Sequence, residues 1–324
     1  MITEKLSQDM KIVFMGTPDF AASILSTLFD AGYMIEAAVS QPDKPVGRHA
    51  ELKPTAVKMK AEELGIPVLQ PEKASDPDFI DKLKAMAPDV IVVAAYGKIL
   101  KPELLSIPRY GCINVHASLL PKWRGAAPIQ WAVIAGDSEA GVTTMLMNEG
   151  LDTGDMLLRS SIPVAEDETG GSLFDKLAEL GSRLIVDTLK ALGDGSLRAE
   201  KQDEGKATYA PMLKKEMGNI DWNMPAADIE RLVRGLCPWP GTFTFSKGKM
   251  IKIHKTSIPD EEKTAKLCKG AYDSGDVITE DGSIYVICGS GALRIDELQA
   301  EGKKRMTAGD YLKGNNLDRF EHER

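Results

Sequence analysis

Long hydrophobic runs are missing from this chain. The longest apolar stretch, residues 90–96, spans seven residues, whereas a membrane-spanning helix needs about 20. Residues 1–9 mix charged and polar side chains without an apolar core, so we expect no signal peptide. Together these absences predict a cytoplasmic protein that does not bind membranes.

Cysteine is scarce, and several familiar motifs are missing. The four cysteines form no Cys-x-x-Cys pair, which argues against a zinc ribbon and a disulfide framework. We therefore expect reduced thiols. Gly16 follows a predicted strand without a Gly-x-Gly-x-x-Gly motif, which disfavours a dinucleotide-dependent oxidoreductase. No Gly-x-Ser-x-Gly nucleophile elbow is present, which favours direct transfer over a covalent enzyme intermediate.

What the chain does contain is typical of a globular protein of about two domains. It has 324 residues, of which 43% are hydrophobic and 27% charged. The formal net charge of −8 lies within residues 1–210, because residues 211–324 hold 18 basic and 18 acidic side chains. Residues 231–255 contain six basic residues and no acidic one. Basic residues are therefore concentrated, without acidic ones between them, in residues 231–255.

Apolar runs alternate with amphipathic segments in the N-terminal part. Strands are predicted at residues 11–15, 35–40, 90–95 and 111–116, and helices at about 19–31, 53–64, 77–87 and 173–192. Thr17 is the expected N-cap of the first helix, with Pro18 at its first position. Because the apolar runs are continuous rather than alternating, the pattern predicts an open, Rossmann-like α/β domain with a mostly parallel sheet.

The pattern changes after a polar tract, which we predict to be a linker at residues 194–209. Beyond it, short alternating strands with turn signals predict a small β-barrel of the OB-like type. The expected organisation is a catalytic domain over residues 1–193, with residues 1–9 as an extension, and a C-terminal domain over residues 210–324.

Two polar side chains mark the carboxyl end of one predicted strand. Asn114 and His116 are two residues apart, so both point to the same face of the sheet, at the end where ligands bind open α/β sheets. An amide and an imidazole supply an oxyanion donor and a proton carrier, as acyl transfer requires. Alternatively, His116 is a hydrogen-bonded core histidine and Asn114 a turn residue.

An acid is needed to orient that imidazole. The candidate is Asp152, in the polar segment Leu151-Asp152-Thr153-Gly154-Asp155. Aspartate and glycine at this spacing are also ordinary turn residues, so one of the two aspartates is expected to serve the turn instead.

Several longer motifs carry a resemblance to a known family. The run Ser118-Leu-Leu-Pro-Lys-Trp-Arg-Gly-Ala-Ala-Pro128, preceded by Asn114-x-His116, is similar to the formyltransferases that use 10-formyltetrahydrofolate. Further matches are Gly16-Thr-Pro-Asp-Phe-Ala21, Gln41-Pro-Asp-Lys-Pro-Val-Gly-Arg48, the Asp152 segment and Cys237-Pro-Trp-Pro-Gly241. The resemblance covers essentially the whole chain. It is strongest to members that formylate the methionine of initiator methionyl-tRNA.

The resemblance implies a role for each matching residue. Asn114, His116 and Asp152 match the catalytic trio, and Ser118, Leu119, Leu120 and Pro121 match the folate-binding segment. The implied reaction carries the formyl group from 10-formyltetrahydrofolate to initiator methionyl-tRNA for translation initiation, without a metal and without an obligate protein partner.

Basic residues are the candidates for holding the tRNA. Arg48, with Lys44 nearby, lies in a Pro-rich segment expected to be irregular until about residue 54, and it matches the arginine of the family's tRNA-contacting loop. In the C-terminal domain Lys247, Lys249 and Lys252 are expected to share one open face and to contact phosphates. The alternative for both regions is a solvated charged surface.

Two other functions remain open from the sequence. A catalytically silent RNA-binding module would explain the basic residues but leave the trio without a role. Another folate-dependent formyltransferase, or a formyltetrahydrofolate hydrolase, would use the same trio with a different acceptor.

Overall fold

The computed structural model describes residues 9–46 and 51–322. The chain forms two compact units. Unit 1 comprises Met1–Pro128, Glu139–Pro163 and Phe174–Ala210, and unit 2 comprises Ile129–Ser138, Val164–Leu173 and Pro211–Arg324. The predicted boundaries at residues 193 and 210 stay predictions.

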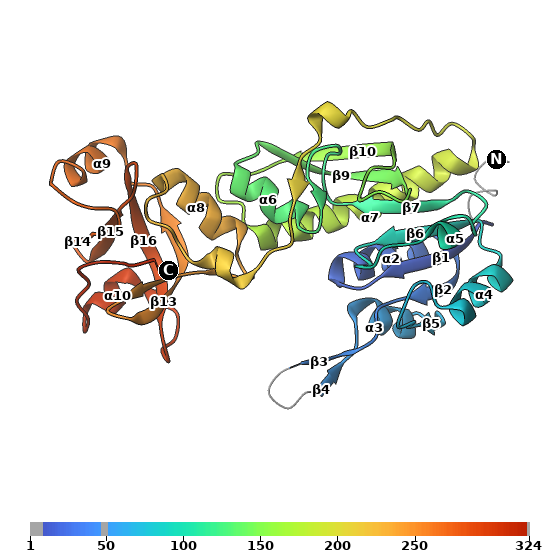
Figure 1. The fold of residues 1–324 in the computed structure, drawn as a ribbon, viewed down its shortest axis with the longest axis horizontal. Coiled ribbons are helices and arrows are strands. Elements are labelled where there is room, and N and C mark those ends of the chain that lie inside the picture. Colours follow the sequence, from blue (N-terminus) through green and yellow to red (C-terminus); the bar gives the residue numbers. More distant parts are fainter. Residues whose placement is uncertain (1–8, 47–50, 323–324) are drawn as a thin grey trace. The chain divides into compact units, whose positions relative to one another are not determined.

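Unit 1 is built on a seven-stranded sheet (Figure 1) with the order β10-β9-β7-β6-β1-β2-β5. The strands β5, β2, β1, β6 and β7 run parallel, whereas β9 and β10 are antiparallel additions at one edge. The mostly parallel α/β architecture is therefore confirmed. The bounds are β1 Lys11–Gly16, β2 Met34–Val39, β5 Val68–Leu69, β6 Val90–Ala94, β7 Cys112–His116, β9 Glu139–Leu146 and β10 Asp155–Pro163.

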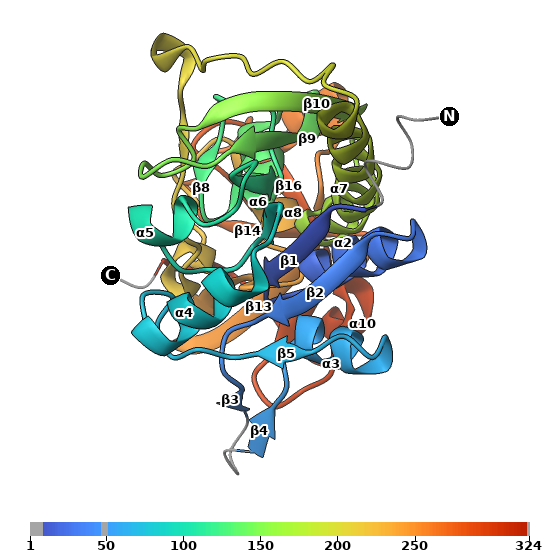
Figure 2. The same cartoon turned by 90° about the vertical axis from the view of Figure 1, so that its right-hand side faces the viewer.

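Helices cover both faces of this sheet, which explains why β6 is buried along its whole length. Figure 2 shows α2 and α7 on one side and α4 and α5 on the other. On the α2 side, the rings of Phe20 and Phe174 meet edge to face at 5.9 Å. The bounds are α2 Asp19–Asp30, α3 Ala56–Glu63, α4 Pro77–Met86, α5 Pro102–Leu105 and α7 Gly170–Gly193.

Two local predictions in unit 1 are wrong. Pro18, not Thr17, occupies the N-cap of α2, because the Thr17 hydroxyl donates instead to the backbone carbonyl of Tyr96 at 3.1 Å. The segment expected to be irregular until residue 54 contains a hairpin of β3 (Lys44–Val46) and β4 (Glu51–Lys53), which projects from the sheet in Figure 1.

Unit 2 contains an antiparallel sheet in the order β12-β13-β16-β15-β14, with β17 beside β16. The segment before the C-terminus bridges its two edges. Phe245 of β12 exchanges backbone hydrogen bonds with Glu321, and Asp276, next to β14, bridges to Arg319. The strand bounds are β12 Thr242–Ser246, β13 Lys249–Ser257, β14 Val277–Glu280, β15 Ser283–Ile287, β16 Ala292–Ala300 and β17 Met306–Thr307.

Short helices complete unit 2. The apolar face of α8 contributes Ile229 and Val233 to the core, where the Trp222 and Phe320 rings stack at 5.5 Å. The helix bounds are α6 Pro128–Ala135, α8 Ala226–Gly235, α9 Glu261–Leu267 and α10 Ala308–Leu312, with a 3-10 turn at Lys215–Gly218. Within the described ranges, no helix combines the length and apolar character needed to cross a bilayer.

Candidate active site

Asn114 and His116 lie on one face at the end of β7. The strand is paired along both edges, with Asn114 opposite Val93 of β6 and His116 opposite Thr143 of β9. Both side chains are largely buried. Across residues 9–46 and 51–322, no side chain or backbone group hydrogen-bonds the Asn114 amide. The amide therefore has capacity for a ligand.

The His116 ring is oriented from two sides. Nε2 donates to the carbonyl oxygen of Trp123 at 3.0 Å, and Nδ1 lies 3.8 Å from Oδ2 of Asp152. Because a carbonyl only accepts, Nε2 carries a proton in this arrangement and Nδ1 is the atom that faces the carboxylate. The side chains of His116 and Asp152 are 7% and 13% exposed, so little water screens the pair.

Asp152 is fixed by the loop between β9 and β10. Its Oδ2 accepts a hydrogen bond from the backbone N–H of Gly125 at 2.9 Å. Its backbone has φ +52°, a left-handed conformation unusual for a residue with a side chain. A Cβ on Gly154 would lie 1.8 Å from the carbonyl oxygen of Leu146, so glycine is required where the loop returns to β10.

Asn148 contributes hydrogen bonds to the turn in this loop. Oδ1 of Asn148 accepts from the backbone N–H of Gly150 at 3.0 Å and from the Thr153 hydroxyl at 2.8 Å. Asp155 begins β10. One aspartate, Asp152, does serve the turn through its left-handed backbone, and its carboxylate nevertheless lies beside His116.

The segment predicted to bind folate forms a braced loop next to β7. The Ser118 hydroxyl donates to the carbonyl of Lys122 at 2.7 Å, and the Thr143 hydroxyl connects Ser118 O with the backbone N–H of Leu120. Ser118 and Leu120 are buried, whereas Leu119 and Pro121 are partly exposed. A ligand would therefore contact the backbone of this loop and the side chains of Leu119 and Pro121.

The predicted tRNA-binding residues are distributed over several elements. Lys44 is exposed at the start of β3, and Arg48 lies outside the described residues. Lys247 pairs with Asp318 at 3.0 Å. Lys249 and Lys252 are exposed on β13, but they are three residues apart on a regular stretch, so their side chains point to opposite faces. The expectation that these lysines share one face is therefore wrong.

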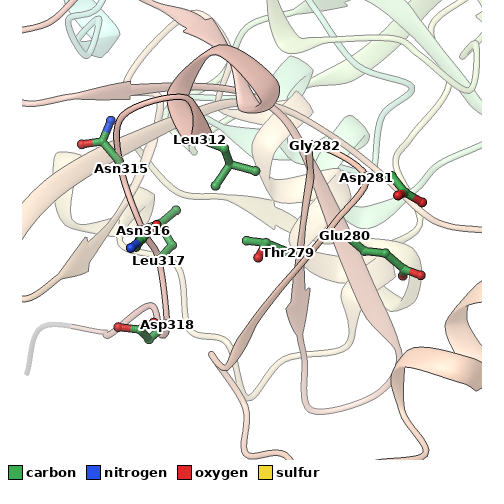
Figure 3. Close-up of a pocket in the computed structure, with 9 residues that line it drawn as sticks. All are labelled: Thr279, Glu280, Asp281, Gly282, Leu312, Asn315, Asn316, Leu317 and Asp318. Atoms are coloured by element: carbon green, nitrogen blue, oxygen red, sulfur yellow. The ribbon is translucent and has the colours of Figure 1, made fainter.

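A hollow of about 380 Å³ in unit 2 contains none of the predicted site residues (Figure 3). It lies between the β14–β15 turn and the segment after α10. Three carboxylates line it, Glu280, Asp281 and Asp318, and the first and last are paired with lysines. In the described part of the chain, no group of three His, Cys, Asp or Glu side chains could hold a metal ion.

Comparison with known proteins identifies the class. The family model described as formyl transferase matches residues 10–189, and the model of the formyl transferase C-terminal domain matches residues 212–316. The fold and these two matches define a formyltransferase, an enzyme that transfers a one-carbon group.

Related sequences show which kind of formyltransferase this chain resembles. The chain is 52% identical over 309 residues to methionyl-tRNA formyltransferase of Caldanaerobacter subterraneus subsp. tengcongensis, covering 95% of this chain and 98% of the relative. The enzyme of the same name from Geobacter metallireducens is 50% identical over 311 residues, covering 95% and 97%. The chain therefore belongs to the formyl transferase family, among the methionyl-tRNA formyltransferases.

Solved structures share the fold at lower identity. HypX from Aquifex aeolicus in complex with tetrahydrofolic acid is 16% identical with a TM-score of 0.60, covering 97% of this chain and 51% of HypX, so the chain spans about half of that protein. An N-formyltransferase from Helicobacter canadensis in complex with folinic acid and dTDP-3-aminofucose is 15% identical with a TM-score of 0.63, covering 90% and 99%. Both comparisons show that this chain shares its fold with these proteins.

Proposed function

We propose that the protein transfers the formyl group of 10-formyltetrahydrofolate to the α-amino group of methionine on initiator methionyl-tRNA. The relatives that cover nearly the whole chain carry the name of this reaction. The observation that carries the chemistry is the grouping of an unpaired amide, Asn114, with an imidazole, His116, whose Nδ1 faces the Asp152 carboxylate. Formylation of this tRNA belongs to translation initiation, which would place the reaction in the cytoplasm.

The site residues fit a formyl donor. The Asn114 amide has no hydrogen-bond partner in residues 9–46 and 51–322, and a formyl oxygen accepts the bond that this amide can donate. The Ser118 loop, braced by Thr143, offers Leu119 and Pro121 to the body of the folate.

The donor supplies an activated formyl carbon attached to its N10 atom. Asn114 and His116 would stabilise the negative charge that develops on the formyl oxygen when the methionine nitrogen forms the new C–N bond. His116, oriented by Asp152, would accept the proton lost by that nitrogen and deliver it to N10 as the carbon–N10 bond breaks. The products are tetrahydrofolate and formylmethionyl-tRNA, so no redox step and no covalent enzyme intermediate is needed.

The tRNA would be held by basic side chains. We assign phosphate contacts to Lys44, Arg48, Lys247, Lys249 and Lys252. Because phosphate contacts do not distinguish sequences, these residues would position the tRNA rather than select the initiator.

A transfer assay tests the function. The full-length protein is incubated with 10-formyltetrahydrofolate labelled in the formyl group and with initiator methionyl-tRNA, glycinamide ribonucleotide, an amino sugar nucleotide or buffer alone. We expect label on the methionine of the tRNA, and little in the other mixtures. Transfer to another acceptor, or release of labelled formate in buffer at a similar rate, would contradict the proposal.

A further inference from the structure

Residues 200–210, which overlap the linker predicted at residues 194–209, are hydrogen-bonded to the loops that carry the candidate site. Glu200 exchanges backbone hydrogen bonds with Met156 of β10, each at 2.8 Å. Farther on, β11 (Tyr209–Ala210) pairs in parallel with β8 (Arg124–Gly125). The segment between these two attachments faces Asp152.

Gln202 makes the contact with Asp152. Its Nε2 donates to the backbone carbonyls of Asp152 and Gly154, both at 2.8 Å, and its Oε1 accepts from Nε of Arg124 at 3.0 Å. Both N–H groups and the oxygen of the side-chain amide are therefore used. The opposite orientation would place Oε1 against two carbonyl oxygens, so the Arg124 contact fixes which way the amide points.

Arg124 is itself held rigidly. Its side chain is 0% exposed, and its guanidinium forms a two-bond pair with Glu204, with Nη1–Oε2 at 2.9 Å and Nη2–Oε1 at 2.7 Å. A buried guanidinium needs such partners because an unpaired charge is costly to bury. Planar pairing to a carboxylate also fixes the direction of the remaining Nε–H, which points to Gln202.

The dipeptide Arg124-Gly125 also binds the side chain of Asp152. Gly125, directly after Arg124, donates its backbone N–H to the Asp152 carboxylate. Asp152 is thus held at its carbonyl by Gln202 and at its carboxylate by Gly125, while its backbone adopts φ +52°. A left-handed non-glycine residue persists only where its surroundings determine it.

We infer that Gln202, braced by the Arg124–Glu204 pair, is a positioning residue that sets the distance between the Asp152 carboxylate and the His116 ring. This inference rests on the proposed function for its effect on catalysis. It gives residues 200–204 a part in formyl transfer, although none of them touches the reacting atoms.

The decisive variant is Gln202→Glu in the full-length protein. A glutamate retains the shape and an oxygen for Arg124, but it replaces the amide N–H groups with an oxygen that repels the carbonyls of Asp152 and Gly154. We expect kcat to fall ~10- to 100-fold, because displacing a catalytic group by about 1 Å has costs of this order. We expect KM for donor and tRNA within about twofold, since binding groups are untouched.

Two further variants separate positioning from folding. Gln202→Ala removes all three hydrogen bonds of the amide and should show the same loss of kcat. Glu200→Gln is the matched control, because Glu200 lies on the same segment as Gln202 and the substitution removes only an exposed ion pair with Arg159. We expect its kcat and KM within about twofold of wild type. Thermal unfolding of all three variants is recorded. Their kcat is measured at a temperature well below the lowest of the three thermal midpoints.

An NMR measurement tests the inference without using activity. The chain has four histidines, so the ring Hε1 resonance of His116 can be assigned by comparison with His116→Gln. We expect Gln202→Glu to displace this resonance and Glu200→Gln to leave it in place. An unchanged resonance together with wild-type kcat in Gln202→Glu would overturn the inference. If wild type transfers no formyl group, the proposed function fails, and the resonance still decides whether Gln202 positions Asp152.

Discussion

Nδ1 of His116 lies 3.8 Å from Oδ2 of Asp152, a separation too long for a direct hydrogen bond. The opposite ring nitrogen donates to Trp123 O, and the same carboxylate oxygen accepts from Gly125 N–H. Each partner is therefore held by a backbone group that is independent of the other. This arrangement lets the charge of Asp152 be removed without releasing the loop.

Asp152→Asn tests the charge. An asparagine oxygen can still accept from Gly125 N–H, so we expect the thermal midpoint to stay within a few degrees while kcat falls ~10²- to 10⁴-fold. Steady-state formylation kinetics give the values. Asp155→Asn, in the same segment, is the control and should retain wild-type kcat to within about threefold. The assignment is reversed if Asp155→Asn is the inactive variant.

Asn114→Ala tests the oxyanion donor. Removal of one preorganised donor costs about 3–4 kcal/mol in the transition state, so we expect kcat to fall ~10²- to 10³-fold with little change in KM. The measurement is steady-state kinetics together with thermal unfolding. Asn315→Ala, which removes a hydrogen bond to Tyr311 O in unit 2, controls for loss of an asparagine. Near-normal kcat in Asn114→Ala would remove the proposed role.

Lys249→Glu and Lys252→Glu are best made separately, because the two side chains point to opposite faces of β13. A lysine that contacts phosphate should, when reversed, weaken tRNA binding and lower the slope of log K against log salt by ~0.7 to 0.9. Filter binding at several salt concentrations gives the slope. Lys82→Glu on α4 is the charge-matched control. Unaltered slopes in both variants would exclude β13 as a phosphate-binding strand.

Glu280 predicts a pH dependence of stability in unit 2. Hydrogen bonds from Lys263 and Lys266 lower its pKa from 4.5 to about 2. Between these values the unfolded chain binds more protons than the folded one, so the contribution is fully present above pH 4.5 and is lost as pH falls toward 2.

Glu280→Gln should therefore unfold at a lower temperature than wild type at pH 7, with the gap closing between about pH 4.5 and pH 2. Thermal unfolding followed by circular dichroism measures both proteins across this range. The exposed Glu301→Gln serves as the control. A gap that stays constant with pH would show that the lysine contacts do not stabilise the fold through the charge of Glu280.

Local patterns in the sequence were sufficient for the main strands and for one half of the candidate site. The apolar run at residues 90–95 is β6, Val90–Ala94, because only a strand covered on both faces buries every consecutive side chain. The spacing of Asn114 and His116 determines that they share a face, since side chains alternate along any strand. The polar segment 151–155 supplied Asp152 as a candidate, and the motif resemblance supplied the reaction and the catalytic role of that residue.

Tertiary structure decided the contacts between distant segments. Asp152 meets His116, and Gln202 meets Asp152, only because β9 pairs antiparallel with β7, β10 pairs antiparallel with β9, and the chain then returns along β8. Periodicity records which residues are buried, but it does not record strand order or register. For the same reason the cap at Thr17 was wrong, because a contact with Tyr96, far along the chain, decides it. The shared lysine face was wrong because β13 begins at Lys249, and alternation along the strand puts Lys252 on the opposite face.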